Sequence, residues 1–123
     1  MNIIIADDSE LLRNSIKESL SDLQNIKIVG EADNGIETVK IIEEKKPDLV
    51  ILDIRMPEMN GIEVLRKIKE GGTKLKVCIF TNYPYSQYKE KCLDEGADYF
   101  FDKNINFQEI KNLIVQLAKE VEK

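Results

Sequence analysis

Short apolar runs alternate five times with stretches in which hydrophobic residues recur at helical spacing. The apolar runs predict five β-strands, at residues 2–6, 27–32, 48–53, 75–80 and 98–101. The other stretches predict a helix after each strand: one that begins after Ser9, one between Asn34-Gly35 and Pro47, one over 61–70, one from Pro84 to about Glu95, and a last one that carries Phe107 to Val121. Such alternation is typical of a parallel sheet with crossover helices.

The apolar character of the strands indicates how the layers are arranged. Strands 2–6 and 48–53 are apolar nearly throughout, as expected where helices cover both faces of a sheet. Crossovers between parallel strands are almost always right-handed. We therefore predict an α/β fold of the flavodoxin type, a doubly wound (βα)5 sandwich, and for its parallel sheet we take the order 2-1-3-4-5, which is common in such folds. On the helices, Ile36 belongs to the apolar repeat of the second, and Val121 is expected on the buried face of the last.

Acidic residues follow two of these strands directly. Asp7 and Asp8 end the first apolar run, and Asp53 ends the third. In the order 2-1-3-4-5 the carboxyl ends of strands one and three lie side by side, at the point where the strand order reverses and ligands bind. Three carboxylates there are well suited to a hard divalent cation, Mg²⁺ or Mn²⁺. The sequence thus predicts a metal site at this edge.

Composition limits the remaining chemistry. A chain of 123 residues predicts one domain, and a net charge of −5 argues against a general nucleic-acid or anionic-membrane surface. Histidine is absent, so any chemistry must use Asp, Thr and Lys. Without a signal peptide or a membrane-length apolar segment, we expect a cytoplasmic, reduced protein in which Cys78 is a small buried hydrophobe.

Further residues at strand ends complete a recognisable pattern. Thr81 follows the fourth strand, Lys103 follows the fifth, and the segment after the third strand reads Asp53-Ile54-Arg55-Met56-Pro57-Glu58-Met59-Asn60-Gly61. With the acidic pair Asp7-Asp8, these residues make essentially the whole chain resemble the receiver domain of bacterial two-component response regulators. The resemblance implies that Asp53 is a phosphoacceptor. It also implies a magnesium site formed by Asp7, Asp8, Asp53 and the backbone carbonyl of Arg55.

The resemblance gives Thr81 and Lys103 the role of holding phosphoryl oxygens. Simpler interpretations exist for every site residue: the aspartates could cap helices, Thr81 could merely end a strand, and Lys103 could be a solvated lysine. Phe100 matches an aromatic switch position, although an ordinary core aromatic is an equal alternative. Asn82 is larger than the residue usual after the threonine in this family, and it is expected to narrow access to the site.

Two variable positions and one departure affect the expected behaviour. Arg55 and Tyr83 match positions that flank the phosphorylation site, and a bulky pair there suggests a shielded, persistent phosphoryl group. The family usually has a cis proline after the lysine, whereas this chain has Asn104. A cis bond before a non-proline residue costs about 3 kcal/mol. We therefore expect either a trans bond with a rearranged loop or a strained cis bond retained to place Lys103.

The leading functional hypothesis is a phosphorylation-driven binding switch that is not an enzyme acting on other substrates. A sensor histidine kinase or histidine phosphotransfer protein would supply the phosphoryl group. A downstream protein or a second copy would bind the face formed by helix four, strand five and helix five. We expect these 123 residues to hold no output domain, and the alternatives left open are a stand-alone receiver, a phosphorelay intermediate or an excised piece of a larger protein.

Three other classes compete with this hypothesis. A pseudo-receiver scaffold is disfavoured by the complete acid set. A phosphohydrolase with an aspartyl nucleophile would carry a second Asp two residues later, where this chain has Arg55. A dinucleotide binder would need a glycine-rich loop after the first strand, where this chain has acidic residues.

Overall fold

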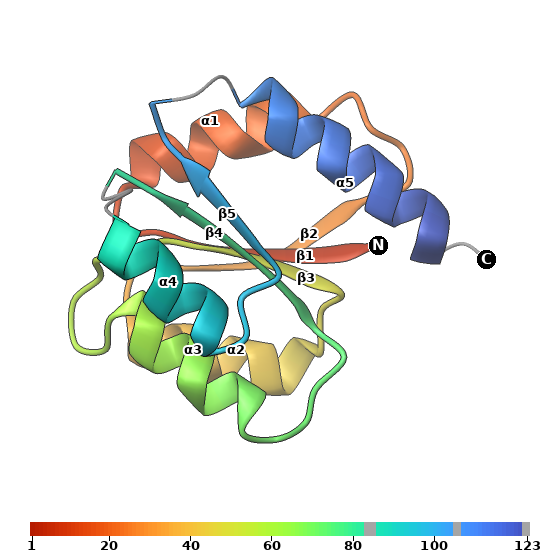
Figure 1. Ribbon diagram of the computed structural model, residues 1–123. Coiled ribbons are helices and arrows are strands. Elements are labelled where there is room, and N and C mark those ends of the chain that lie inside the picture. The colour runs from red at the N-terminus through yellow and green to blue at the C-terminus, as the bar shows by residue number, and fades with distance from the viewer. Residues whose placement is uncertain (83–85, 105–106, 122–123) are drawn as a thin grey trace.

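A five-stranded parallel sheet with helices on both faces forms the protein, seen here in a computed structural model that describes residues 1–82, 86–104 and 107–121 (Figure 1). The strand order is β2-β1-β3-β4-β5. The strands are β1 (Asn2–Ala6), β2 (Lys27–Ala32), β3 (Leu49–Leu52), β4 (Lys76–Thr81) and β5 (Tyr99–Asp102). The predicted fold and strand order are therefore confirmed.

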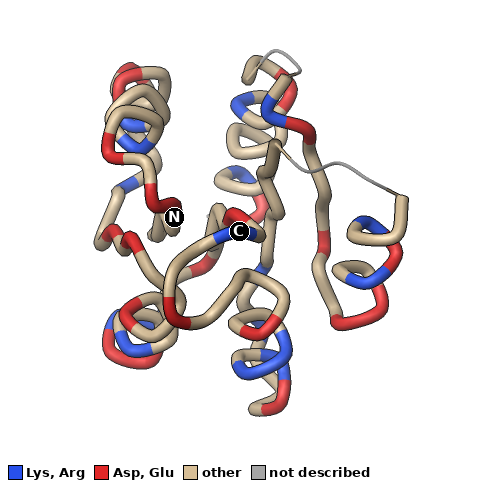
Figure 2. Tube along the Cα trace, turned by 90° about the vertical axis from the view of Figure 1, so that its left-hand side faces the viewer, with Lys and Arg blue, Asp and Glu red and all other residues tan. Residues whose placement is uncertain are grey.

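Five helices connect and cover these strands. They are α1 (Glu10–Leu20), α2 (Gly35–Lys45), α3 (Gly61–Lys69), α4 (Ser86–Asp94) and α5 (Gln108–Val121). Helices α1 and α5 lie on one face of the sheet, and α2, α3 and α4 lie on the other (Figure 1). Most charged residues lie on the helices and loops (Figure 2). Across the described ranges, we find no helix with the length and apolar character needed to cross a membrane.

The sheet separates two hydrophobic cores. Successive side chains of a strand point to opposite faces, so β1 places Ile3 and Ile5 in the core under α1 and α5, and Ile4 in the other core. Both cysteines are buried and unpaired, Cys78 in the first of these cores and Cys92 in the second. Burial raises the pKa of the Cys78 thiol to about 12. Its predicted role as a small buried hydrophobe is confirmed.

Three of the helices begin with a side-chain cap at the carboxyl edge of the sheet. The side chains of Ser9, Asn34 and Asn60 accept hydrogen bonds from backbone N–H groups in the first turns of α1, α2 and α3. Such caps satisfy donors that have no partner within the helix. They also fix the places where the chain leaves the strands and turns into the helices, and these places surround the predicted site.

The element bounds differ from the predicted ones by about a residue at most strand ends, but two side chains lie where they were not expected. Val121 is 49% exposed, so its predicted place on the buried face of the last helix is wrong. Ile36 is 54% exposed, and Gly35, Thr38 and Ile42 supply the buried face of α2 instead. The predicted helix start at Pro84, together with Tyr83 and Tyr85, falls outside the described residues. Tyr88, in the first turn of α4, packs against the core that contains Ile4.

Candidate functional site

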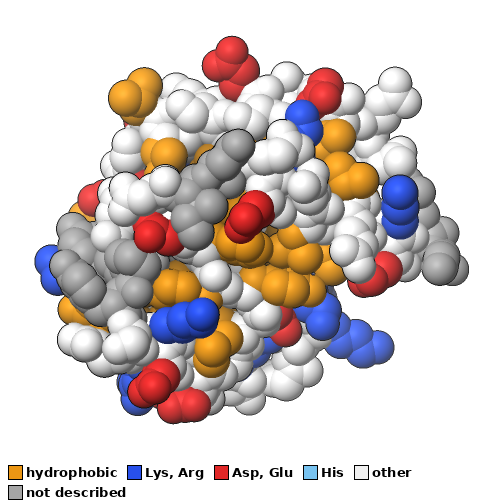
Figure 3. Space-filling model, turned by 45° about the horizontal axis from the view of Figure 1, so that its top comes forward, with side chains coloured by type: hydrophobic (Ala, Val, Ile, Leu, Met, Phe, Trp, Pro, Cys, Tyr) orange, Lys and Arg blue, Asp and Glu red, His pale blue; other side chains and the backbone are white. Residues whose placement is uncertain are grey.

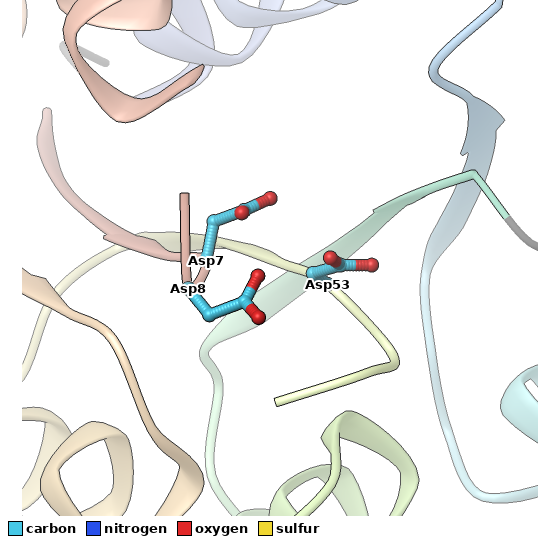
Figure 4. A group of neighbouring side chains, drawn as sticks. All are labelled: Asp7, Asp8 and Asp53. Atoms are coloured by element: carbon cyan, nitrogen blue, oxygen red, sulfur yellow. The ribbon is translucent and has the colours of Figure 1, made fainter. Parts of the chain in front are cut away.

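Three carboxylates meet at the carboxyl edge of the sheet. Asp7 and Asp8 follow β1 and Asp53 follows β3, and one oxygen from each lies within 4.8 Å of the others (Figure 4). The strand pairing causes this meeting, since β1 and β3 are neighbours and the Asp53 N–H donates to the Ala6 carbonyl at 3.0 Å. Asp7 and Asp53 are only 3% and 5% exposed, whereas Asp8 is exposed to solvent. The sequence prediction that these residues converge is confirmed.

Lys103 joins two of these carboxylates. Its Nζ donates to Asp7 Oδ2 at 2.6 Å and to Asp53 Oδ2 at 3.0 Å, and its side chain is only 9% exposed. The ammonium group also lies 6.0 Å from the centre of the Phe80 ring. Lys103 is therefore not a solvated surface lysine, and the simpler interpretation of this residue is wrong.

The surroundings raise the pKa of both Asp53 and Lys103. Burial raises the pKa of Asp53, and the nearby Asp7 adds to the effect, while the contact with Lys103 and the Ile54 N–H oppose it. For Lys103, burial acts to lower the pKa, but the hydrogen bonds to Asp7 and Asp53 outweigh it and the pKa is raised. The negative form of Asp53 thus lies in surroundings that favour an added positive charge.

The loop after Asp53 is held by two glycines. The Asp53 Oδ1 accepts the N–H of Ile54 at 2.7 Å, and the Gly61 N–H donates to the Ile54 carbonyl at 2.6 Å. A Cβ atom at Gly61 would overlap the carbonyl oxygen of Asp53, and one at Gly35 would overlap that of Met59. The first turn of α3 therefore packs directly against the backbone of Asp53, and the first turn of α2 packs against Met59 later in the same loop.

The remaining predicted site residues take different positions. Thr81 is fully buried at the end of β4, and its carbonyl accepts the Lys103 N–H at 2.8 Å. Phe100 is partly buried against the core that contains Ile4, while Asn82 and Arg55 are exposed. Tyr83 lies outside the described residues. The roles of these residues in phosphate handling stay predictions.

The turn after β5 resolves the question raised by Asn104. Every peptide bond among the described residues is trans, including the bond between Lys103 and Asn104. The Asn104 N–H donates to Asp102 Oδ1 at 2.8 Å, so the loop turns back on the last residue of the strand. Lys103 therefore reaches both carboxylates from a trans loop, the first of the two expected arrangements.

Arg13 contacts the site but was not predicted from the sequence. Its Nη1 donates to the backbone carbonyl of Asp7 at 2.6 Å, and its Nε donates to Glu31 Oε1 at 3.1 Å. The signal that could have found it is spacing: Arg13 lies four residues after Ser9, and helical side chains lean back toward the preceding turn. Arg13 thus ties the backbone of the acidic pair to the end of β2.

The donor set at this edge suits a hard cation. The three converging groups are carboxylates, and Mg²⁺ prefers oxygen ligands and retains several waters, so few protein ligands suffice. Asp7 and Asp53 are buried and held by backbone hydrogen bonds, and the exposed Asp8 leaves the group open to solvent. The residues present therefore fit a magnesium ion.

Comparisons with known proteins agree with one another. A family model described as "Response regulator receiver domain" matches residues 3–115. The transcription regulator BvgA of Bordetella pertussis is 37% identical over 110 residues, which make up 89% of this chain and 52% of BvgA. The chain spans about half the length of the curated relatives it matches.

Solved structures resemble this fold closely. The signal receiver domain of the response regulator NarL from Mycobacterium tuberculosis superposes with a TM-score of 0.88 at 28% identity, covering 96% of this chain and 95% of that one. A chain from the CheX-CheY-BeF3-Mg²⁺ complex of Borrelia burgdorferi has a TM-score of 0.87 at 26% identity, covering 95% and 88%.

Proposed function

The chain belongs to the response regulator receiver domain family of two-component signalling, and on that premise we propose that Asp53 accepts a phosphoryl group in a Mg²⁺-dependent reaction. The observation that carries this proposal is the shared lysine: a buried carboxylate, two further carboxylates and Lys103 meet at one edge. A structural ion pair would need one acid for one base. Here the acids are in excess, as a cation-dependent phosphoryl acceptor requires.

The proposed donor is a phosphohistidine on a sensor kinase or a phosphotransfer protein, because this chain has no histidine. An Asp53 carboxylate oxygen attacks phosphorus and forms a P–O bond while the P–N bond to the donor imidazole breaks. The imidazole keeps the bonding electron pair and takes up a proton. The product is an acyl phosphate, one of the standard covalent intermediates.

Lys103 has two proposed tasks in this reaction. Before transfer it neutralises part of the charge on Asp7 and Asp53, to which it is hydrogen-bonded. After transfer, its ammonium turns to the phosphoryl oxygens, whose charge is about −1.5 to −2 at neutral pH. We assign the hydroxyl of Thr81 the second donor role, because β4 ends at this residue beside β3.

A bound Mg²⁺ would be held by Asp7, Asp8, Asp53 and the Arg55 carbonyl, and it would offset repulsion between the carboxylates and the incoming phosphoryl oxygens. The structurally similar complex from Borrelia burgdorferi contains Mg²⁺, which supports this choice of metal by likeness of fold. Mn²⁺ has the same ligand preferences and is the alternative.

The new charge on Asp53 is proposed to change a partner-binding surface. Strand β5 is at the edge of the sheet, and its residues Tyr99, Phe100 and Phe101 are each partly exposed. Figure 3 shows apolar side chains gathered in the middle of the face on which β5 lies between α4 and α5. Apolar side chains at such a place suit a protein partner or a second copy, so the proposed output is protein contact.

We propose that the chain is not an enzyme acting on other phosphate esters. The position two residues after Asp53, where an aspartyl phosphohydrolase would carry its acid–base residue, is Arg55, which is exposed. Incubation with a chromogenic phosphate monoester should therefore release no product beyond the rate without protein. Release that continues over many turnovers and depends on Asp53 would favour the phosphohydrolase instead.

The test of the main proposal is intact mass after incubation with acetyl phosphate. The parent, Asp53→Asn and Asp94→Asn are compared with Mg²⁺ and with EDTA, where Asp94 is an exposed aspartate at the end of α4. We expect one added phosphoryl group in the parent and in Asp94→Asn, only with Mg²⁺, and none in Asp53→Asn. A folded parent that gains no mass, or an equal gain in Asp53→Asn, would contradict the proposal.

A further inference from the structure

The backbone around Lys103 is held on both sides. The Lys103 N–H donates to the Thr81 carbonyl at 2.8 Å, which continues the pairing of β5 with β4 by one residue. The next N–H, that of Asn104, donates to the side chain of Asp102 at 2.8 Å. An aspartate whose side chain accepts the N–H two residues on closes a turn that imitates a backbone turn. Lys103 is the residue enclosed by it.

Lys103 needs such a restraint because its side chain must hold one conformation to contact both carboxylates. The ammonium reaches Asp7 and Asp53 on the two neighbouring strands, and the side chain is almost fully buried. Burying a lysine loses more rotamer entropy than burying almost any other side chain. A backbone free to take several conformations at this point would reduce the fraction of molecules in which Nζ meets both carboxylates.

We propose that Asp102 is a positioning residue for phosphoryl transfer: its carboxylate closes the turn that directs Lys103 into the acidic site. This inference rests on the proposed function. Asn104 can take part because it has a backbone N–H, which a proline at this position would lack. In this chain a side-chain hydrogen bond restrains the loop, and the residue that supplies it lies directly before the lysine.

Asp102 could instead act through its charge, and two substitutions separate these roles. Asp102→Asn removes the charge but keeps an oxygen that can accept the Asn104 N–H. Asp102→Ala removes both. If the turn is what matters, Asp102→Asn behaves like the parent, and if the charge matters, it behaves like Asp102→Ala. Asp94→Ala is the matched control for loss of one exposed carboxylate far from the turn.

The experiment measures two quantities on the whole chain: the rate of phosphorylation by acetyl phosphate with Mg²⁺, and hydrogen exchange at the Asn104 amide. We expect Asp102→Ala to phosphorylate roughly fivefold more slowly, the factor that corresponds to one net hydrogen bond, and to exchange faster at Asn104. Asp102→Asn should restore both quantities to near the parent values. Asp94→Ala should change neither.

Measurements in a second background test the same hydrogen bond from its donor side, at Asn104. Asn104→Pro removes the donor, so in that background Asp102→Ala should produce no further decrease in the phosphorylation rate. Parent-like phosphorylation in Asp102→Ala would overturn the inference, as would Asp102→Asn being as slow as Asp102→Ala. If the parent itself is not phosphorylated, the proposed function fails and the role in transfer fails with it. Exchange at Asn104 then still reports whether the turn exists.

Discussion

The two edges of the sheet hold charged side chains in opposite proportions. At the amino edge, the Asp98 carboxylate accepts the Val77 N–H at 2.8 Å and lies 3.3 Å from Lys69 Nζ and 3.8 Å from Lys76 Nζ. At the carboxyl edge, Asp7, Asp8 and Asp53 converge and Lys103 is shared by two of them. One acid paired with two lysines forms a stabilising salt-bridge cluster, whereas three acids with one shared lysine leave negative charge uncompensated.

This difference supports the carboxyl edge as the place of the proposed phosphoryl transfer, although a pocket opens at the other edge. A pocket of about 710 Å³ opens at the amino edge, with Ile42, Leu75 and Leu117 among its lining residues. The converging carboxylates lie at the other end of the strands. The proposal rests on buried charge without full compensation rather than on volume, because such charge is unfavourable unless a ligand completes it.

The largest expected effect comes from crowding the carboxyl edge. Gly61→Ala should lower the free energy of unfolding by about 3 kcal/mol, because the added Cβ overlaps the Asp53 carbonyl and the loop must move. Urea unfolding gives the stability, and intact mass gives the phosphorylation, which should also fall.

Gly71→Ala is the control at the amino edge, where the nearest atom to the added Cβ is the Ile68 carbonyl oxygen at 3.9 Å. It should change stability little and phosphorylation not at all. Equal losses of stability in the two variants would remove the distinction between the edges.

A smaller loss of stability is expected when the salt-bridge cluster around Asp98 at the amino edge is broken. Asp98→Ala leaves the Val77 N–H without its acceptor and removes one of the two acceptors of Lys69 Nζ, which keeps the Leu75 carbonyl. This should lower the free energy of unfolding by about 2 kcal/mol. Phosphorylation of the folded variant should remain at the parent rate. Loss of phosphorylation in a variant that is still folded would mean that the amino edge also serves the chemistry.

Much of this arrangement could be predicted from the sequence, and the exceptions share a cause. Apolar runs set the strands, and the order 2-1-3-4-5, which is common in doubly wound sheets, brings Asp7 and Asp53 together, so the acid cluster could be predicted. The contact of Gly35 with Met59, the hydrogen bond from Arg13 to the Asp7 carbonyl and the turn at Asp102 do not. These depend on how loops approach backbone atoms, which hydrophobic periodicity does not encode.

Side-chain burial on helices shows the same limit. Val121 continues the apolar repeat of α5 but is exposed at the last residue of the helix. Thr38 interrupts the apolar repeat of α2, yet it is fully buried because its hydroxyl donates to the Asn34 carbonyl at 2.7 Å. Spacing predicts which positions share a face of a helix. It does not predict where the neighbouring element ends.

The smallest expected change is an increase in the free energy of unfolding, and it comes from substituting Asp53. Its raised pKa means that the folded state favours the protonated form. The stability this contributes is full below the unfolded pKa of about 4 and is lost as the pH rises through the folded pKa. Asp53→Asn cannot ionise, so without divalent metal it should be slightly more stable than the parent at neutral pH. That advantage should shrink as the pH falls toward 4.

The most direct test of the uncompensated carboxyl edge is the free energy of unfolding of the parent and Asp53→Asn, each with and without Mg²⁺ at neutral pH. We predict that Asp53→Asn is the more stable protein without metal and that Mg²⁺ stabilises the parent more, so that the gap closes or reverses. A parent that is the more stable without metal and does not respond to Mg²⁺ would contradict the account.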